Sequence, residues 1–324
     1  MVNVRAQVTQ LDRGFPLVTL PNGNQIRCKH ATVLVKKDSL RAVVGDWVEV
    51  LIDERADMAQ IVTIEPRRRT LVRKDPAERQ VPQTLAANFD TIIIAHPLAD
   101  LNIRRLEREL VLAFETGARI IIALTKADLA EDDQFTKNLD LVQSIVSDDV
   151  TVLAVRDKDK TSIDTLRSFI PTHTIAVLIG RSGVGKSSLV NLLAQEEIQA
   201  TTPVRDDGKG RHTTVNRAMI PIRDGGAIID MPGVRGLGLW DADAGLSAAF
   251  HDITDLAATC RFRDCTHTDE PGCAVKAAVT SGKLNQKRLD SYIHLYAENL
   301  SQKKKKEEAQ RIAERGHKSH HKRH

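Results

Sequence analysis

Apolar residues alternate with polar ones through the first 65 residues, for example at Val2, Val4, Ala6 and Val8. This period is typical of strands with one buried face. The strands that we expect lie at residues 2–8, 17–20, 25–28, 31–35, 47–52 and 59–64. They predict a small β-barrel of the OB type over residues 1–66, an architecture that often binds nucleic acids. A barrel that serves only for packing is the alternative.

From Asp90 onward, short buried-strand runs alternate with amphipathic segments. In the helix expected at 103–114, for example, Leu106, Leu110 and Ala113 share one face. Strands are expected at 91–95, 120–124, 150–155, 174–179, 218–222 and 227–229, and helices at 103–114, 135–146, 162–169 and 186–194. This order predicts an α/β domain over residues 89–238, with a mostly parallel sheet and helices on both faces.

Charge changes the interpretation of two segments outside these domains. Residues 67–88 form a basic linker, either a hinge held open by charge repulsion or part of an RNA-facing surface. Residues 301–324 carry nine basic and three acidic side chains, whereas the whole chain has a net charge of +4. Such a tail contacts an anionic polymer or is merely solvated. Between them, residues 239–300 include an amphipathic helix at 285–300.

The apolar runs are short. The longest lie near 91–95 and 120–124, far below the roughly 18 residues that a membrane span requires. No cationic and apolar leader opens the chain. We therefore expect a soluble, cytoplasmic protein that does not contact a membrane. We also expect it to be a monomer.

Residues 180–187 read GRSGVGKS and lie between an expected strand and an expected helix. This is the setting of a phosphate-binding loop, in which glycines allow close approach and backbone N–H groups bind phosphate oxygens. Lys186 is expected to reach the β- and γ-phosphates, and Ser187 to ligate Mg²⁺. The expected nucleotide-binding residues of this segment are Gly180, Ser182, Gly183, Val184, Gly185, Lys186, Ser187 and Ser188.

A second phosphate-side motif, Asp-x-x-Gly, follows the last expected strand. Asp230 is expected to hold a Mg²⁺-bound water, and the amide of Gly233 to sense the γ-phosphate. In the preceding polar segment, Thr213 and Thr214 are both candidates for the threonine that completes Mg²⁺ coordination. An ordinary loop is the alternative for that segment.

Hydrolysis requires an oriented water molecule. Many GTPases place a glutamine directly after the Asp-x-x-Gly glycine, but this chain has Val234 there. The imidazole of His212, beside the two threonines, is the candidate for this role. A surface or RNA-contacting histidine is the alternative. The catalytic candidates are therefore His212, Lys186, Thr213 and Thr214.

Thr125-Lys126-Ala127-Asp128 ends another expected strand and reads as the guanine-recognition motif Asn-Lys-x-Asp, with threonine in place of asparagine. The carboxylate of Asp128 can accept both the N1–H and N2–H groups of guanine, a donor pair that adenine lacks. The stem of Lys126 is expected to cover the base. In most GTPases the phosphate loop precedes this motif, so the reversed order here predicts a circular permutation.

Three cysteines and a histidine are close together near the C-terminal end. Cys260, Cys265, His267 and Cys273 supply the ligands for one closed tetrahedral Zn²⁺ site of structural type. The clustering of three of the four cysteines favours a metal site in a reducing compartment. The remaining one, Cys28, is expected to be a small core residue.

Together the segments 87–90, 125–128, 180–188, 210–214, 230–233 and 260–273 resemble, in this order, the RsgA (YjeQ) family of circularly permuted GTPases. The resemblance implies an OB fold, a permuted GTPase domain and a zinc domain that bind GTP or GDP, Mg²⁺ and one Zn²⁺. It also implies that the small (30S) ribosomal subunit stimulates hydrolysis and that the protein acts in late maturation of that subunit, in contact with its rRNA. Arg156, where this family has a small serine or alanine, is a departure, as is Thr125; the basic tail is an addition expected to contact rRNA.

Two alternatives of other classes stay open. One is a P-loop NTPase of tRNA metabolism, and the other is an RNA-binding module in which the nucleotide is structural.

Overall fold

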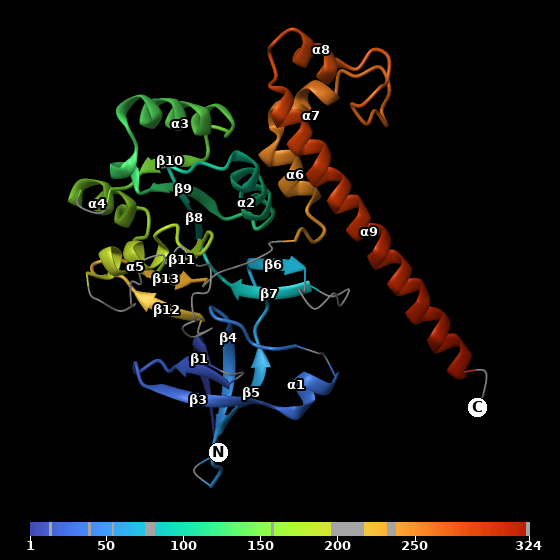
Figure 1. The fold of residues 1–324 in the computed structure, drawn as a ribbon. Helices are drawn as coiled ribbons and strands as arrows, with labels where there is room; N and C mark the ends of the chain where they lie inside the picture. The colour runs from blue at the N-terminus through green and yellow to red at the C-terminus, as the bar shows by residue number, and fades with distance from the viewer. Residues whose placement is uncertain are drawn as a thin grey trace, which may run out of the picture.

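The computed structural model describes residues 1–324 except 13–14, 38–39, 54, 75–81, 157–158, 196–216, 232–237 and 322–324. Its elements follow one another as three groups: a β-rich N-terminal part, a central α/β part and a helical C-terminal part (Figure 1).

The N-terminal part is a barrel. Within the described residues its strands are β1 (Val2–Asp12), β2 (Phe15–Thr19), β3 (Gln25–His30), β4 (Trp47–Ile52) and β5 (Ala59–Ile64). They pair in the order β1-β2-β3-β5-β4, and an additional pairing of β1 with β4 closes the ring. Alternate residues such as Val8, Val48 and Val50 fill the interior and are fully buried.

The strand expected at residues 31–35 is wrong, because this segment forms the short helix α1 (Thr32–Lys37). Leu34 packs on the barrel core, whereas the neighbouring Val33 is 66% exposed. An apolar run of this length is compatible with both periods, so the pattern alone does not separate strand from helix.

The central sheet has the order β10-β9-β8-β11-β13-β12. All its pairs are parallel except β12–β13. Its strands are β8 (Thr91–Pro97), β9 (Arg119–Thr125), β10 (Thr151–Ala154), β11 (Ile175–Ile179), β12 (Arg217–Pro221) and β13 (Ala227–Asp230). Its helices are α2 (Ile103–Glu115), α3 (Asp132–Ser144), α4 (Lys160–Ser168) and α5 (Lys186–Ala194). The α/β architecture expected from the alternating pattern is confirmed.

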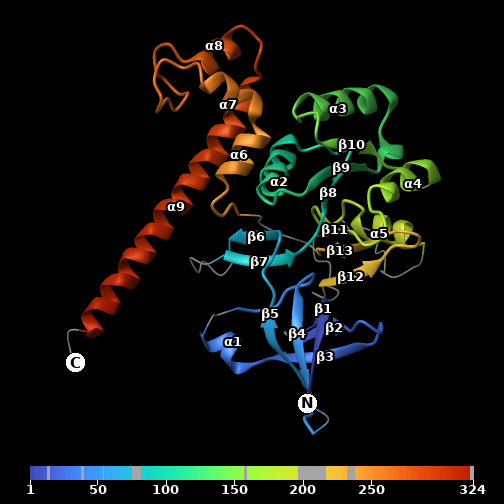
Figure 2. The same cartoon turned by 180° about the vertical axis from the view of Figure 1, so that it is seen from behind.

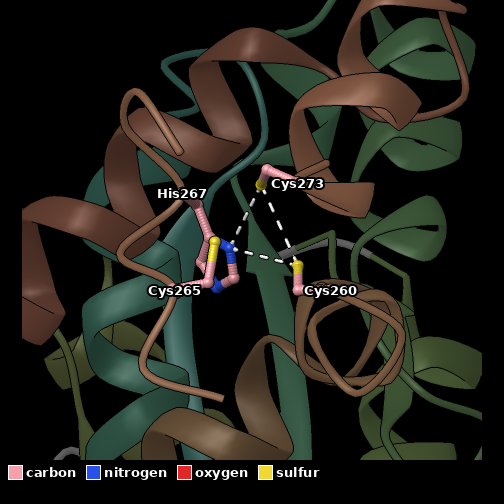
Figure 3. Close-up of side chains that lie close together, drawn as sticks. All are labelled: Cys260, Cys265, His267 and Cys273. Atoms are coloured by element: carbon pink, nitrogen blue, oxygen red, sulfur yellow. Dashed lines mark hydrogen bonds between the residues drawn. The ribbon is translucent and has the colours of Figure 1, made fainter. Parts of the chain in front are cut away.

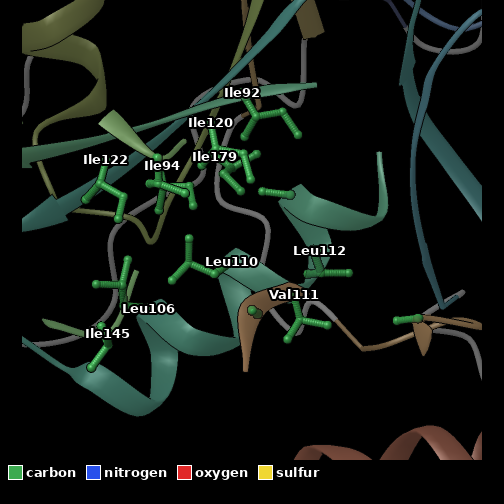
Figure 4. Close-up of a cluster of buried hydrophobic side chains, with 14 of the residues drawn as sticks. Ile92, Ile94, Leu106, Leu110, Val111, Leu112, Ile120, Ile122, Ile145 and Ile179 are labelled. Atoms are coloured by element: carbon green, nitrogen blue, oxygen red, sulfur yellow. The ribbon is translucent and has the colours of Figure 1, made fainter. Parts of the chain in front are cut away.

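The strand residues alternate between two hydrophobic clusters. Ile92 and Ile94 of β8 pack with Leu106 and Leu110 of α2 on one face (Figure 4). Ile93 belongs to the cluster on the other face, together with residues of α5. Helices therefore cover both faces of the sheet. Because the strands are parallel, their carboxyl ends lie together at one edge of the sheet.

The segment expected as a linker contains a two-stranded hairpin, β6 (Thr70–Lys74) and β7 (Pro82–Ala87). Arg67 binds the buried carboxylate of Asp46 in the barrel, at 2.8 Å. Arg68 binds Asp90 of the α/β domain. The hinge held open by repulsion is not what the structure shows, because these guanidinium groups join the two domains.

The barrel and the central sheet are also continuous. Gln10 and Leu11 of β1 pair with Ala218 and Arg217 of β12, so the strands of the barrel and of the central sheet form one 11-stranded sheet among the described residues. Close by, a Cβ atom on Gly45 would lie 1.9 Å from the carbonyl oxygen of Ala87. Glycine at position 45 is therefore required for this junction.

The C-terminal helices are α6 (Asp243–Ala249), α7 (His251–Ala257), α8 (Ala274–Thr280) and α9 (Gln286–His321). The helix expected at 285–300 is confirmed but continues through the basic tail. The tail is rich in Lys, Glu, Ala and Arg, which are strong helix formers. In Figures 1 and 2, α9 begins beside α6 and α7, and its C-terminal half projects away from the other elements.

In the described part of the chain, no helix is both long and apolar enough to cross a membrane. The longest helix, α9, is strongly polar.

Candidate nucleotide and metal sites

The segment between β11 and α5 has the backbone of a phosphate-binding loop. Gly180, Gly183 and Gly185 have φ angles of +145°, +83° and +100°, a region that residues with a Cβ rarely adopt. A Cβ atom on Gly180 would also lie 2.5 Å from the carbonyl oxygen of Ala95 at the end of β8. Glycines are therefore needed both for the curvature of this loop and for its close packing on β8.

Lys186 holds the loop from inside. Its side chain is largely buried, and Nζ donates hydrogen bonds to the carbonyl oxygens of Gly180 (2.8 Å) and Arg181 (3.0 Å). Burial lowers the pKa of Lys186, while the nearby carboxylates of Asp230 and Glu109 act in the opposite direction. The ammonium group thus lies where anionic phosphate oxygens would meet it.

The Thr-Lys-x-Asp segment contacts this loop directly. The hydroxyl group of Thr125 lies 2.5 Å from the carbonyl oxygen of Val184, and Lys126 donates to that of Gly183 at 2.8 Å. Asp128 is exposed in the following 3-10 turn η1 (Ala127–Leu129). Two segments that are far apart in the sequence therefore form one loop cluster at the carboxyl edge of the sheet.

Arg156 follows β10 beside this cluster. The amide of Ala127 donates to the carbonyl oxygen of Val155, which places Arg156 next to the turn that carries Asp128. The guanidinium carbon of Arg156 lies 5.3 Å from the ring centroid of Phe135 on α3. Phe135 therefore holds this large side chain at the position where a small residue was expected.

Asp230 ends β13, which pairs in parallel with β11, and it is 7% exposed. Ser187 and Ser188 lie in the first turn of α5 and are partly buried. The other expected residues, His212, Thr213, Thr214 and Gly233, lie outside the described residues. The structure thus brings together the phosphate loop, the base motif and Asp230.

Sequence reasoning missed two buried polar residues near this edge, His96 and Glu109. His96 is 2% exposed, and its Nδ1 atom lies 3.3 Å from Oε2 of Glu109. One feature of the sequence could have indicated this pair. Glu109 shares the buried face of α2 with Leu106, Leu110 and Ala113, and a carboxylate at such a position requires a partner.

The four zinc-ligand candidates converge on one point (Figure 3). Nδ1 of His267 lies 3.7 Å from Sγ of Cys260 and 3.5 Å from Sγ of Cys273, and these two sulfur atoms are 3.9 Å apart. Including Cys265, all four ligand atoms lie within 4.8 Å of one another. Tetrahedral Zn²⁺ with bonds of about 2.3 Å to sulfur requires such separations, so the cluster fits a closed zinc site.

The C-terminal part that carries the cysteine–histidine cluster docks on α2 through a buried cation. Arg288 of α9 binds Glu107 of α2 at 2.9 Å and Asp252 of α7 at 2.9 Å. Its guanidinium group also lies over the ring of Phe250. A second pair joins Arg108 to Glu298, at 2.7 and 2.6 Å. Sequence reasoning did not identify this interface.

Further along, α9 binds the segment that follows the Asp-x-x-Gly motif. Asn299 accepts a hydrogen bond from the amide of Ala242 and donates to Asp243. Lys303 also binds Asp243, and Lys306 binds Asp241 at 2.8 Å. Part of the basic tail is therefore paired within the molecule.

Comparison with known proteins agrees with this arrangement. A family model described as RsgA GTPase matches residues 64–240. A second model, described as 50S ribosome-binding GTPase, matches residues 175–322 and so begins at the first residue of β11. The second model therefore starts at the strand that precedes the phosphate loop, as expected for a GTPase domain whose order is not permuted.

Two similar relatives share the name small ribosomal subunit biogenesis GTPase RsgA. The protein from Streptomyces avermitilis is 43% identical over 90% of this chain and 79% of its own length. The protein from Methanosarcina acetivorans is 43% identical over 82% of this chain and 72% of its own length.

Among solved structures, YjeQ from Thermotoga maritima matches with a TM-score of 0.68 and 25% identity, over 92% of this chain and 99% of that one. YloQ, described as a circularly permuted GTPase, matches with a TM-score of 0.63 and 23% identity, over 92% and 95% of the two chains. The second likeness supports the fold alone.

Proposed function

The chain belongs to the RsgA GTPase family, and from this premise we propose that it hydrolyses GTP during late maturation of the small ribosomal subunit. The observation that carries the proposal is the contact of Thr125 and Lys126 with the phosphate loop. These bonds join the Thr-Lys-x-Asp segment, which we propose recognises guanine, to the loop that we propose binds the phosphates. A single guanine nucleotide would span the distance between them.

Each group in this cluster has a proposed role. Backbone N–H groups of residues 180–188 and Lys186 bind the phosphates, and Asp128 accepts the two donors of guanine. Ser187, Asp230 and one of Thr213 and Thr214 would hold Mg²⁺, since hydroxyl and carboxylate oxygens suit this hard cation. When bound, Mg²⁺ neutralises charge that develops on the β- and γ-phosphates.

For the water-positioning step we propose His212. Val234 occupies the usual glutamine position and has no polar atom to orient water. His212→Ala should lower the turnover stimulated by 30S particles while leaving the dissociation constant for GDP unchanged. Unchanged stimulated turnover would remove His212 from the mechanism.

The RNA-binding surfaces are proposed to lie on the barrel, the zinc-bearing part and the basic half of α9. The barrel pairs with β12, and α9 binds the segment after the Asp-x-x-Gly motif. The barrel and α9 are thus attached to a strand and a segment that adjoin the proposed γ-phosphate site. Release of the γ-phosphate would reach them through these attachments. We propose that the protein acts as a cytoplasmic monomer on the 30S particle.

The test measures GTP hydrolysis by the full chain alone, with purified 30S particles and with tRNA. We expect slow turnover alone and strong stimulation by 30S particles. Equal rates with and without 30S particles would contradict the proposal, and stimulation by tRNA alone would support a role in tRNA metabolism. Co-sedimentation with 30S particles, using GDP and a non-hydrolysable GTP analogue, then shows which nucleotide state binds the subunit.

A further inference from the structure

The segment 238–243 follows the Asp-x-x-Gly motif and lies along one side of α9. Two backbone hydrogen bonds hold it there. The amide of Leu239 donates to the carboxylate of Glu298 at 3.3 Å, and the amide of Ala242 donates to Oδ1 of Asn299 at 3.0 Å. Leu239 and Asn299 are fully buried. Because neither bond involves a lysine, the segment is fixed beside α9 whether or not the lysines of that helix are paired.

Two aspartates of this segment bind two lysines of α9. Lys303 binds Asp243, and its Nζ atom also lies 3.8 Å from a carboxylate oxygen of Asp241. Lys306 binds Asp241 at 2.8 Å. Residues that are three apart lie on the same side of a helix, so both lysines face the segment. The two acids therefore neutralise one side of the basic run at 303–306.

These ion pairs are open to competition by other anions. The side chains of Asp241 and Asp243 are 45% and 62% exposed. Ion pairs at such exposed positions are weak, because water solvates both charges. Lys304, Lys305 and Arg311 of the same helix are exposed. A polyanion that binds these three side chains would therefore bring its phosphate groups close to the paired lysines.

We propose that Asp241 and Asp243 compete with the phosphate groups of RNA for Lys303 and Lys306, and thereby limit the affinity of α9 for RNA. The inference rests on the RNA binding proposed above for the basic half of α9. Without RNA, each aspartate occupies the place beside a lysine that a phosphate group would take. RNA that binds either lysine has to displace a carboxylate. Because such linkage is reciprocal, RNA on this side of α9 weakens the contact between the helix and the segment after the Asp-x-x-Gly motif.

The double variant Asp241→Asn/Asp243→Asn tests this competition. Asparagine keeps the size of the side chain and an oxygen that can accept the hydrogen bond which Asn299 donates to Asp243. Asparagine also tolerates the positive φ angle of +51° at position 241. The change therefore removes two charges and little else. The measurement is the affinity of the full chain for purified 30S particles over a series of KCl concentrations, with the nucleotide that gives the tighter complex.

We expect the asparagine variant to bind 30S particles about three- to tenfold more tightly at low salt, with a salt slope that is steeper by about one to two, because two further lysines meet phosphates. Lys303→Ala/Lys306→Ala should bind like the unmodified chain, since its missing lysines were already paired. In the background of that alanine variant, the two asparagines should give no gain.

Asp140→Asn/Asp148→Asn is the matched control for net charge. Both acids are exposed, on α3 and in the loop after it, and so lie outside the parts that we propose bind RNA. This variant should have the affinity and the salt slope of the unmodified chain. The same gain in this control as in Asp241→Asn/Asp243→Asn would show an effect of net charge alone and would overturn the inference.

Two further results would overturn it. One is an unchanged affinity and salt slope in folded Asp241→Asn/Asp243→Asn, and the other is a gain of equal size in the alanine background. If the double variant does not fold, Asp241→Asn with and without Lys306→Ala repeats the comparison on one ion pair. An unmodified chain that does not bind 30S particles would instead refute the proposed function.

Discussion

The hydroxyl group of Thr125 lies 2.5 Å from the carbonyl oxygen of Val184, although 59 residues separate the two along the chain. The contact exists because β9 and β11 both flank β8, so the loops at their carboxyl ends meet at one edge. Strand order in the sheet, rather than order in the sequence, therefore determines which motifs meet. This is why a permuted chain can form the same nucleotide site.

Removing this hydroxyl group should weaken nucleotide binding. Thr125→Val keeps the side-chain shape but leaves the carbonyl oxygen of Val184 without that partner. We expect GDP to bind about 5- to 30-fold more weakly, as measured by titration. Thr165→Val is the control, because its exposed hydroxyl group bonds to a carbonyl oxygen of its own helix. Equal affinities of the two variants would contradict a role for the Thr125 contact.

Asp128→Asn should change the base that is recognised. The asparagine amide cannot accept both guanine donors, so GDP affinity should fall by about a hundredfold. Xanthosine diphosphate, which has a carbonyl group at C2, should gain affinity because the amide can donate to it. Asp132→Asn, at an exposed acid on α3, should alter neither. Retained preference for GDP in Asp128→Asn would place base recognition elsewhere.

Loss of one metal ligand should remove zinc and unfold its surroundings. The full chain should contain one Zn²⁺ per molecule by elemental analysis, and Cys273→Ala should contain none. Because structural zinc contributes folding energy, we expect the melting temperature to fall by at least about 5 °C. Cys28→Ala, which changes a buried cysteine in the barrel, should keep its zinc. Full zinc content in Cys273→Ala would exclude the proposed ligand set.

Arg288→Met should destabilise the protein strongly, by about 3–5 kcal/mol, because the carboxylate of Glu107 then stays buried without its cation. Burial already raises the pKa of Glu107 in the folded protein, and loss of Arg288 raises it further. The folded variant would hold a proton that the unfolded chain has released, so its stability falls as pH rises above the usual glutamate range. Denaturant unfolding should therefore show a larger deficit at pH 8 than at pH 5.

The double variant Arg288→Met/Glu107→Leu provides the control, since an apolar pair of similar volume should recover most of the loss. A deficit that is the same at both pH values, or that persists in the double variant, would contradict this account of the interface.

Residues 303–306 of α9 are four lysines that should separate into two functional pairs. Lys303→Ala/Lys306→Ala removes ion pairs with Asp241 and Asp243 and should cost about 1 kcal/mol of unfolding free energy. Lys304→Ala/Lys305→Ala, at exposed positions, should leave stability unchanged but weaken binding to 30S particles and reduce its salt dependence. If both double variants weakened binding to 30S particles equally, the ion pairs of Lys303 and Lys306 would not distinguish these lysines from Lys304 and Lys305.

Local patterns predicted most elements of the α/β domain. The helix expected at 186–194 has those bounds in the structure, because the phosphate loop sets its start. The order of the motifs also predicted the permutation. Residues 31–35 and the extent of α9 were less well predicted, since short apolar runs and strong helix formers carry no signal of where an element ends.

Long-range ionic contacts left no such pattern. Arg288 binds Glu107 across 181 residues, and nothing near either residue in the sequence indicates the other. The same holds for Arg67 and Asp46, whose pairing turned an expected linker into part of a domain junction. His96 and Glu109 were visible only as polar residues within apolar segments.

The pairing of β1 with β12 has a consequence for any attempt to isolate the catalytic part. Deleting residues 1–66 would remove β1 from Arg217 and Ala218 of β12 and expose backbone donors and acceptors at this edge of the remaining sheet. Such a fragment would tend to aggregate through this edge. The barrel thus covers the β12 edge of the GTPase sheet.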